Sequence, residues 1–267
     1  TPMVLSPTTA TSPNRSTVND GSPSPSACTS RKTSVSWPFS WLGRPSARRW
    51  ATGRSLPRSQ GHYAGMGAVR EVVEGALAAG VEVLTLFAFS QENWQRPADE
   101  IDALMALLEE YIAKEAQELR QSGVSVRMLG DLDRLVPSAR QAVERIERDT
   151  LGGDKLALNI CISYGSRAEI TRAARLLAEQ VVRGEIDPAE IDEAAVSRQL
   201  YTGPWPDPDL LIRTSGEMRL SNFLLWQLAY AEIHVTSVLW PDFTRKDLFR
   251  AIIDYQRRER RFGRVSV

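Results

Sequence analysis

The chain has 267 residues with 33 basic and 33 acidic side chains, so its formal net charge is zero. This length suits one large domain, and an apolar content of 42% is ordinary for a globular protein. Zero net charge argues against a general nucleic-acid binder, so any bound anion must be held by a local cluster of cations. Two cysteines, Cys28 and Cys161, form neither a disulfide framework nor a zinc site, which fits a cytoplasmic protein.

Residues 1–45 differ in composition from the rest of the chain. Ser, Thr and Pro dominate them, and Asp20 is their only acidic residue. Such a segment cannot bury enough apolar surface to offset its ordering entropy, which predicts disorder. A Ser-rich, acid-poor leader is also typical of an organellar transit peptide. We therefore divide the chain into this segment and a folded domain over 46–267.

Helical and strand patterns alternate through the folded domain. A helix is predicted over 65–79, and a buried strand over 81–89 that is far shorter than the roughly 20 apolar residues of a membrane span. Further helices are predicted over 98–121, 138–150, 166–182, within 183–200, over 221–230 and over 244–263, and strands over 124–129, 156–163, 209–214 and 232–239. This alternation predicts an α/β fold, a single domain with a mainly parallel central sheet flanked by helices.

Ligands of such folds bind beyond the carboxyl ends of the strands, which directs attention to two loops. The first follows the strand over 81–89 and reads SQENWQRP. A polar loop with Trp94 and Arg96 directly after a buried strand is a candidate site. The same residues also suit a helix entry, with Ser90 or Asn93 as the cap and Trp94 as a hydrophobic staple.

The second loop follows Ile212 and carries Arg213 and Arg219 on either side of a small polar turn. Helix N-termini bind anions through free N–H groups, and the arginine fork matches phosphate oxygens. A capped helix with solvated arginines is the alternative interpretation. The loop is therefore a candidate phosphate site.

Two further positions carry candidate chemistry. Arg58 and His62 precede a predicted helix, where a lone histidine is more often a cap or surface residue than a catalyst. Glu232 stands at the start of a mostly apolar strand, and a carboxylate buried there needs a partner. A hard cation such as Mg²⁺ or a buried salt bridge would serve.

Three blocks of sequence carry a family resemblance. They read FSQENWQRP, IRTSGEMRLSNFLLWQLAYAE and LWPDF, and GHYAGM and the closing ERRFG agree with them. In this order they resemble the cis-prenyltransferases of the bacterial undecaprenyl diphosphate synthase type, collinearly from about Arg49 to Val265. The resemblance implies condensation of isopentenyl diphosphate with an allylic diphosphate, above all farnesyl diphosphate, to give a polyprenyl diphosphate. No DDxxD motif of the unrelated trans-prenyltransferases occurs.

The resemblance also implies roles for individual residues. Asn93 matches the residue described as the proton acceptor, although a neutral amide is a very weak base and is better suited to orienting a diphosphate or relaying a proton. Glu232 matches a carboxylate that supports Mg²⁺, the implied cofactor, across the interface of a homodimer. The implied substrate-binding residues are Arg49, Trp50, Arg58, His62, Ser90, Gln91, Glu92, Trp94, Arg96, Arg213, Arg219, Leu220 and Ser221.

Within that set, Arg213, Arg219 and Ser221 match residues that bind isopentenyl diphosphate, whereas Arg58 and His62 match contacts of the allylic diphosphate. The growing lipid needs an apolar tunnel, and the helix after Pro97 would form one wall of it. Spacing alone makes the apolar face of that helix an ordinary core face. Because the implied product is a lipid, we expect a cytoplasmic enzyme that works near a membrane surface and binds no nucleic acid.

The sequence departs from the family at its first motif, Met-Asp-Gly-Asn-Gly-Arg-Trp. Arg49 and Trp50 match its end, but Pro45 stands at the position of the Asp and 46–48 replace Gly-Asn-Gly. Proline cannot bind a metal, and residues 34–43 do not have the pattern of the expected apolar strand. A reading-frame error or a misjoined gene explains the abrupt change. The alternative is a non-catalytic homologue that binds prenyl lipid or acts as a partner subunit.

Overall fold

The protein, analysed as a computed structural model, is described here over residues 33–37 and 44–259, without the side chains of 33–37, 44, 45 and 58. Most of the segment 1–45 therefore lies outside the described residues, as do 260–267. The described ranges include one strand and the start of one helix from the segment 1–45.

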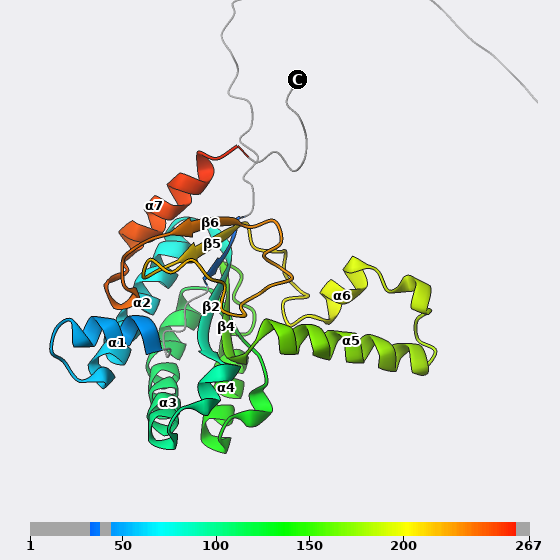
Figure 1. Cartoon of the computed structure of the whole chain (residues 1–267), viewed down its shortest axis with the longest axis horizontal. Helices are drawn as coiled ribbons and strands as arrows, with labels where there is room; N and C mark the ends of the chain where they lie inside the picture. Colours follow the sequence, from blue (N-terminus) through cyan, green and yellow to red (C-terminus); the bar gives the residue numbers. More distant parts are fainter. Residues whose placement is uncertain (1–32, 38–43, 260–267) are drawn as a thin grey trace, which may run out of the picture. The chain divides into compact units, whose positions relative to one another are not determined.

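The centre of the fold is a six-stranded sheet with the order β3-β4-β2-β1-β5-β6 (Figure 1). Every neighbouring pair of these strands is parallel, which confirms the predicted parallel sheet. The strands are β1 Thr33–Trp37, β2 Val81–Ser90, β3 Val124–Leu129, β4 Leu156–Tyr164, β5 Leu210–Arg213 and β6 Glu232–Val235.

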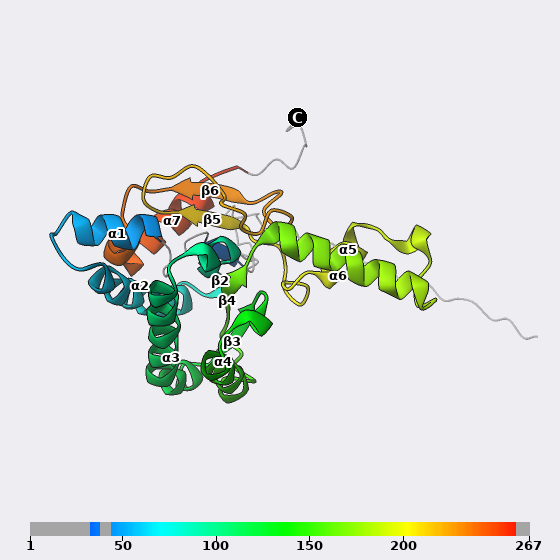
Figure 2. The same cartoon turned by 60° about the horizontal axis from the view of Figure 1, so that its bottom comes forward.

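Helices connect and flank these strands (Figures 1 and 2). In both views α5 and α6 lie side by side, away from α1, α2 and α7. None of the helices in the described ranges is long and apolar enough to cross a bilayer. They are α1 Arg44–Thr52, α2 Arg58–Ala78, α3 Ala98–Gln121, α4 Pro137–Asp149, α5 Ser166–Val182, α6 Glu193–Gln199 and α7 Arg245–Gln256.

The core lies where the sequence is apolar on both faces of a strand. All but one residue of β2 are buried, as expected for a central parallel strand covered by helices on both sides. Helix α3 contributes the buried side chains Leu104, Met105, Leu108 and Ile112 to the same core. The predicted apolar face of this helix is therefore confirmed as a core face.

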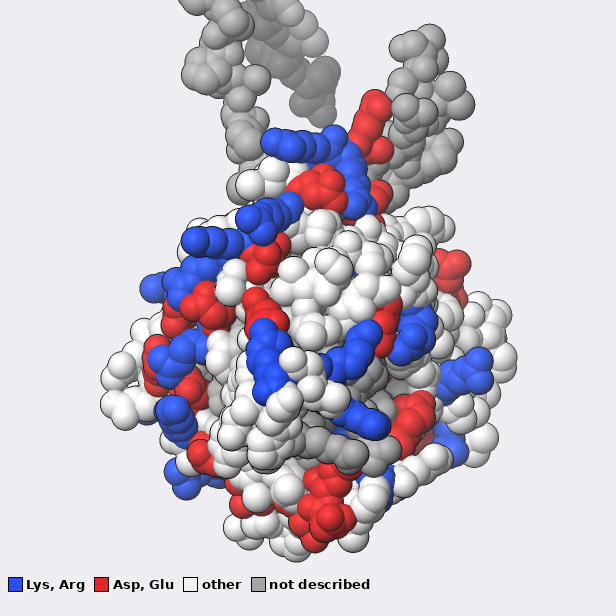
Figure 3. Space-filling view, turned by 60° about the vertical axis from the view of Figure 1, so that its left-hand side comes forward, with Lys and Arg blue, Asp and Glu red and all other residues white. Residues whose placement is uncertain are grey.

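Basic and acidic side chains alternate over the surface that carries α1, α2 and α7. Figure 3 shows Lys and Arg interleaved with Asp and Glu on this face, without a patch of a single sign. That distribution agrees with the zero net charge of the chain. An anion on this face must therefore be bound by a few convergent cations, not by a broad field.

Strand β1 and helix α1 were not expected from the sequence. Residues 34–37 form part of β1, whose Val35 is in register with Leu84 of β2 and Leu210 of β5, so the prediction of no strand is wrong there. Backbone pairing on both sides defines this strand, which explains why a polar TSVSW pattern concealed it. Helix α1 begins at Arg44, directly before residues 45–48, which replace the Asp-Gly-Asn-Gly of the first family motif.

The predicted helix over 221–230 is also wrong. Ser221, Asn222 and Leu224 have φ angles of 55°, 60° and 45°, which a right-handed helix does not allow. The segment instead forms a series of turns. These turns bury Phe223 and Leu224 in an apolar cluster on the sheet, with Phe223 stacked 4.9 Å from Phe87.

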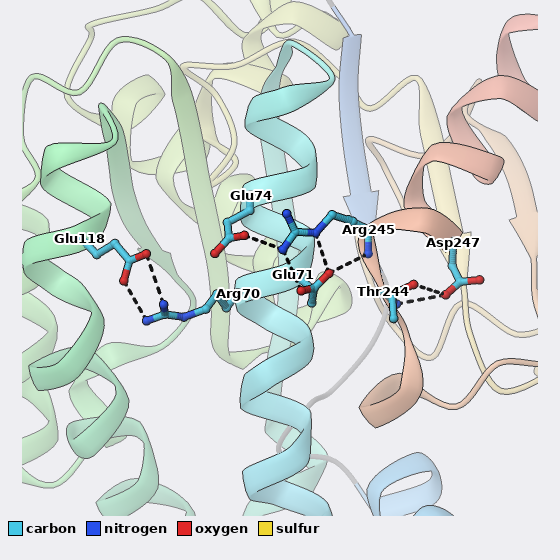
Figure 4. Close-up of polar contacts among 7 residues, drawn as sticks. All are labelled: Arg70, Glu71, Glu74, Glu118, Thr244, Arg245 and Asp247. Atoms are coloured by element: carbon cyan, nitrogen blue, oxygen red, sulfur yellow. Dashed lines mark hydrogen bonds and ion pairs between the residues drawn. The ribbon is translucent and has the colours of Figure 1, made fainter.

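Helix α2 is fastened to α7 by one arginine. Arg245 of α7 contacts Glu71 at 2.8 Å and Glu74 at 2.6 Å (Figure 4). The helices pack tightly, since a Cβ on Gly75 would lie 3.0 Å from the Cβ of Arg245. The hydrogen bonds from Arg245 lower the pKa of Glu71 to about 2, although partial burial raises it.

We expect Glu71→Gln to lower stability near neutral pH by about 1 kcal/mol or less, because the pair is partly exposed and screened. The folded pKa of Glu71 lies below its ordinary value, so its contribution is present above about pH 4.5 and is lost as the pH falls toward 2. Denaturant unfolding of both proteins from pH 7 to pH 2.5 would test this. Glu144→Gln, at an exposed pair on α4, should show a smaller difference at every pH.

Candidate active site

The candidate site is built at the carboxyl end of β5. Arg213 is the last residue of this strand, and its side chain is 9% exposed. A tight turn follows, in which Ser215 and Gly216 have φ angles of 70° and 66°. Their N–H groups donate to Val238 and Thr236 on the neighbouring segment, at 2.9 and 2.8 Å. The turn directs the next side chains back toward Arg213.

Three arginines converge on one carboxylate in this turn. Arg49 and Arg219 contact the two oxygens of Glu217 at 3.1 and 2.9 Å, and Arg213 also donates to Glu217. Burial and the neighbouring Arg219 and Arg49 lower the pKa of Arg213, but an arginine remains charged in proteins. One carboxylate cannot neutralise three cations, so the cluster keeps an excess positive charge suited to a diphosphate.

Two hydroxyl groups in the same turn point to a ligand. Thr214 Oγ1 and Ser215 Oγ are buried, and neither has a hydrogen-bond partner among the described residues. Buried polar atoms without partners are uncommon because they cost free energy. Phosphate oxygens beside the three arginines would satisfy them. Ser221 is exposed and Leu220 packs against the apolar cluster near Phe223.

Arg49 is placed by contacts of its own helix and of the turn after it. Its neighbour Trp50 donates from Nε1 to Asp242 at 2.6 Å, and Arg54 contacts both oxygens of Asp242 at 3.1 Å. The Arg54 guanidinium also lies 4.5 Å from the centre of the Trp50 ring. These contacts fix α1 against the segment 240–242. Sequence reasoning missed Asp242, although it lies in the quoted block LWPDF.

The loop after β2 forms the helix entry that was one of its two interpretations. The Asn93 Oδ1 accepts a hydrogen bond from the Ser90 N–H at 3.0 Å, which forms a capping box. Trp94 packs on Phe89 with ring centres 5.0 Å apart, so the helix entry with its hydrophobic staple is confirmed. Trp94 Nε1 also donates to Ser163 Oγ at 2.9 Å, which holds the indole over the end of β4.

Asn222 connects this loop with the start of α5. Its Nδ2 donates to Glu92 at 2.9 Å, and its Oδ1 accepts from the Arg167 N–H at 2.9 Å. Partial burial raises the pKa of Glu92, but the hydrogen bonds from Asn222 and the cap outweigh it and lower that pKa overall. Gly165 makes room for this bridge, since a Cβ there would lie 2.8 Å from Asn222 Nδ2. The positive φ of Asn222, which sequence reasoning did not detect, makes the bridge possible.

We expect Asn222→Ala to raise KM for both diphosphates that the resemblance implies by about tenfold, because one net hydrogen bond is worth about 1 kcal/mol and an ordered loop is lost with it. The measurement is steady-state kinetics with each substrate varied in turn. Gln227→Ala, in the same segment but turned toward Glu169 and Thr202, serves as the control. Equal effects of the two variants would contradict a bridging role for Asn222.

Two more of the predicted residues, His62 and Arg96, lie around a groove between α2 and α3. His62 lines a pocket of about 370 Å³ together with Ala103, Leu104 and Leu107. Arg96 pairs with Glu100, another residue of this pocket, at 3.3 Å. Gln91 faces a different pocket, beside Ser163. The side chain of Arg58 lies outside the described residues.

Glu232 does not join the arginine cluster within the chain. It stands at the start of β6, in register with Leu210, whereas Arg213 is in register with Val235. Three residues of strand separate the two levels by roughly 10 Å. Glu232 instead pairs with Arg258 at 2.9 Å, which is the salt-bridge alternative.

The described side chains do not assemble a resident magnesium site. Among them, no three His, Cys, Asp or Glu residues are grouped so that they could hold a metal ion. The carboxylate of Glu232 is committed to Arg258. Magnesium therefore stays a prediction of the resemblance, and we assign it no step.

Residues 45–48, which replace the first motif of the family, lie in a helix instead of an open loop. Ser46 and Ala47 lie in α1 and are fully buried, and Ser46 Oγ accepts from the Trp240 N–H at 2.8 Å. The carbonyl oxygen of Ala47 lies so close to α2 that a Cβ on Gly61 would be 2.3 Å from it. Residues 46 and 47 are thus packed between neighbouring elements.

The fold is a parallel α/β sheet in which three arginines converge at the carboxyl end of β5, an arrangement suited to an anion such as a diphosphate. The profile of the family described as "Putative undecaprenyl diphosphate synthase" matches residues 46–263. The chain belongs to this family of cis-prenyltransferases, and is therefore a prenyltransferase by family.

Named relatives agree with this assignment. An isoprenyl transferase of Heliobacterium mobile is 49% identical over 219 residues, which cover 82% of this chain and 84% of the relative. A (2E,6E)-farnesyl-diphosphate-specific ditrans,polycis-undecaprenyl-diphosphate synthase of Xanthomonas axonopodis pv. citri is 49% identical over 218 residues, covering 82% and 85%. The crystal structure of lavandulyl diphosphate synthase from Lavandula x intermedia, in complex with dimethylallyl diphosphate, has a TM-score of 0.82 at 33% identity and covers 86% of this chain and 98% of its own.

Proposed function

We propose that the chain elongates an allylic diphosphate with isopentenyl diphosphate to give a cis-polyprenyl diphosphate. The observation that carries this proposal is the convergence of Arg49, Arg213 and Arg219 on Glu217 at the carboxyl end of β5. The pocket that His62 lines with Ala103, Leu104 and Leu107 supports it, because a partly apolar pocket suits a prenyl chain. The farnesyl specificity named for the Xanthomonas relative supports farnesyl diphosphate as the allylic substrate.

The reaction needs two diphosphates held close together. The bond from C1 of the allylic substrate to its diphosphate oxygen breaks, and the diphosphate leaves with the electron pair. The double bond of isopentenyl diphosphate supplies the electrons for a new carbon–carbon bond to that C1, and a proton lost from its C2 restores a double bond. Convergent arginines would bind one diphosphate and orient its carbon chain, which lowers the entropic part of the barrier.

The amide of Asn93 would hold the loop in shape and would not act as a base. Its oxygen already accepts the hydrogen bond from Ser90, and a neutral amide is a very weak base. The released proton is better accepted by an oxygen of the departing diphosphate. Asn93 and Trp94 would then set the shape of the loop that covers the allylic head.

Incubation of the full chain with farnesyl diphosphate, labelled isopentenyl diphosphate and Mg²⁺ tests the proposal. Chain extension yields labelled products that an organic solvent extracts. Binding of farnesyl diphosphate without any extension would support the alternative, a non-catalytic homologue that binds lipid or a partner subunit. The helical residues 46–48 favour that alternative, because they replace the expected phosphate-binding loop.

We further propose that two copies pair through the edge strand β6. This strand ends the sheet, and its Ile233 and Val235 side chains are 51% and 38% exposed beside the exposed Tyr230. An apolar sheet edge is a ready template for a second chain. Light scattering with Ile233→Lys would test the pairing. Since the product is a lipid, we place the reaction in the cytoplasm at a membrane surface.

A further inference from the structure

The carboxyl end of β4 contains a residue that has no partner in the register of the sheet. Ile162 and Tyr164 are in register with residues of β2, whereas Ser163 between them is not, and the register shifts there. Such a β-bulge bends a strand and redirects the side chain of the extra residue. The φ angle of Ser163 is 50°, in the left-handed region. Residues other than glycine rarely adopt this region, and those that do cluster at functional sites.

The loop after β3 holds Ser163 in this conformation. The N–H of Asp131 donates to the carbonyl oxygen of Ser163 at 3.2 Å. Gly130 has a φ angle of 140°, and a Cβ there would lie 2.0 Å from the carbonyl oxygen of Ile162. Glycine therefore permits the loop to approach β4 this closely. Because Ser163 is also fully buried, its side chain is directed by its neighbours and not by solvent.

The side chain of Ser163 supports the indole of Trp94. Its Oγ accepts a hydrogen bond from Trp94 Nε1 at 2.9 Å. The guanidinium of Arg134 lies 5.1 Å from the centre of the indole, and the ring of Phe89 lies 5.0 Å from it at an angle of 74°. Cation–π and edge-to-face contacts are both favourable in this geometry. We call Ser163, Arg134 and Phe89 the indole support.

The indole support connects three segments at one edge of the sheet. The strands β3, β4 and β2 are parallel neighbours, so their carboxyl ends lie together. Trp94 comes from the loop after β2, Arg134 from the loop after β3, and Ser163 from the end of β4. Trp94 also lies within the short 3₁₀ helix Gln91–Gln95. Fixing the indole therefore fixes the whole turn that follows β2.

We propose that Ser163 is a positioning residue for the allylic diphosphate, and that it acts through the indole of Trp94. This inference rests on the proposed function, in which the loop after β2 covers the head of the allylic substrate. Ser163 touches no reacting atom in this account. Its left-handed backbone places a hydroxyl group where the indole N–H needs an acceptor. Arg134 restrains the face of the same indole, and contributes less because its side chain is exposed.

The central test is Ser163→Gly, because glycine adopts a φ angle of 50° without steric cost but supplies no hydroxyl group. We expect this variant to unfold at the temperature of the parent or above it. Calorimetry with Mg²⁺ should show a dissociation constant for farnesyl diphosphate raised about fivefold, and one for isopentenyl diphosphate within about twofold of the parent. A serine with a merely structural role would not weaken the binding of one substrate in a protein of undiminished stability.

Two matched controls separate the indole support from general effects of the substitutions. Ser55 also has a left-handed backbone, with a φ angle of 55°, but it is exposed between α1 and α2. Ser55→Gly should therefore leave both dissociation constants unchanged. Arg134→Met should weaken the binding of farnesyl diphosphate about twofold. Arg140→Met, which removes the same charge from a nearby ion pair with Asp133, should not.

A double-mutant cycle shows whether Ser163 acts through Trp94. The substitution Trp94→Phe removes the indole N–H, so the addition of Ser163→Gly should weaken the binding of farnesyl diphosphate no further. The difference in fluorescence between each protein and its Trp94→Phe counterpart isolates this indole from the other tryptophans. We expect acrylamide to quench that difference signal more strongly after Ser163→Gly, and also after Arg134→Met, because the indole becomes more accessible.

The outcomes distinguish this inference from the proposed function. Weaker binding of farnesyl diphosphate alone, absent in the Trp94→Phe background and accompanied by stronger quenching, would support the inference. Binding that Ser163→Gly leaves unchanged, or weakens equally with and without the indole, would overturn the inference and leave the proposed function standing. A parent that binds no farnesyl diphosphate would overturn both, even where quenching shows that Ser163 holds the indole.

Discussion

Replacing Arg213 with alanine is expected to lower kcat/KM for isopentenyl diphosphate by about 10²–10³, the usual cost of losing one preorganised electrostatic contact. Arg213 is the only one of the three clustered arginines whose side chain is nearly buried, at 9% exposed against 48% for Arg49 and 61% for Arg219. Low exposure strengthens its interaction with a bound diphosphate. Steady-state kinetics with varied isopentenyl diphosphate measures the effect.

The substitution Arg213→Lys separates charge from geometry. Lysine keeps the positive charge but lacks the planar fork, so it should recover only part of the loss. Arg250→Ala, at a side chain that is 75% exposed on α7, is the control and should leave kcat/KM within about twofold of the parent. Full activity of Arg213→Lys would show that the fork is not needed.

Restoring the family motif is expected to have the second large effect, in the opposite direction. The variant Pro45→Asp/Ser46→Gly/Ala47→Asn/Arg48→Gly should raise kcat by about 10² or more, because it supplies a carboxylate that would hold the implied Mg²⁺ and backbone N–H groups for a diphosphate. It should also lower stability. Two glycines in a helix cost about 1 kcal/mol each, and the bond from the Trp240 N–H to Ser46 is lost.

The control for this experiment carries the same three changes at 46–48 but keeps Pro45. It should lose stability without the gain in kcat, because the carboxylate is missing. Product assays and thermal unfolding of the parent and both variants provide the comparison. A parent as active as the repaired chain would show that the family carboxylate is not needed here.

Long elements with a clear period were predictable from the sequence. Helix α3 and strand β2 agree with prediction to within one residue, because one buried face or a fully buried run leaves a strong pattern. Strand β1 was missed because its partners define it and its own polar residues do not. The turns over 221–230 were missed because helix-forming residues such as Leu224 there adopt positive φ angles for tertiary reasons.

The residue types of the candidate site were predictable from the sequence, but the contacts between these residues were not. Arg213 and Arg219 stood out as cations around a turn, and the structure brings Arg49 to them from a helix 160 residues or more away. The role of Glu217 could have been predicted from the sequence, because a carboxylate between two arginines indicates an ion pair. The separation of Glu232 from Arg213 depends on the register of β5 and β6, which no local pattern specifies.

The place of β1 in the sheet has a consequence for how the chain folds. Val35 pairs with Leu84 on one side and, on the other, with Leu210, which lies 175 residues later in the chain. During synthesis from the N-terminus, β1 has no partner on its second side until the segment of β5 has been made. Such a high contact order slows folding and leaves a strand edge open to aggregation. Loss of residues 33–37 would therefore divide the sheet at its centre, rather than shorten the chain at one end.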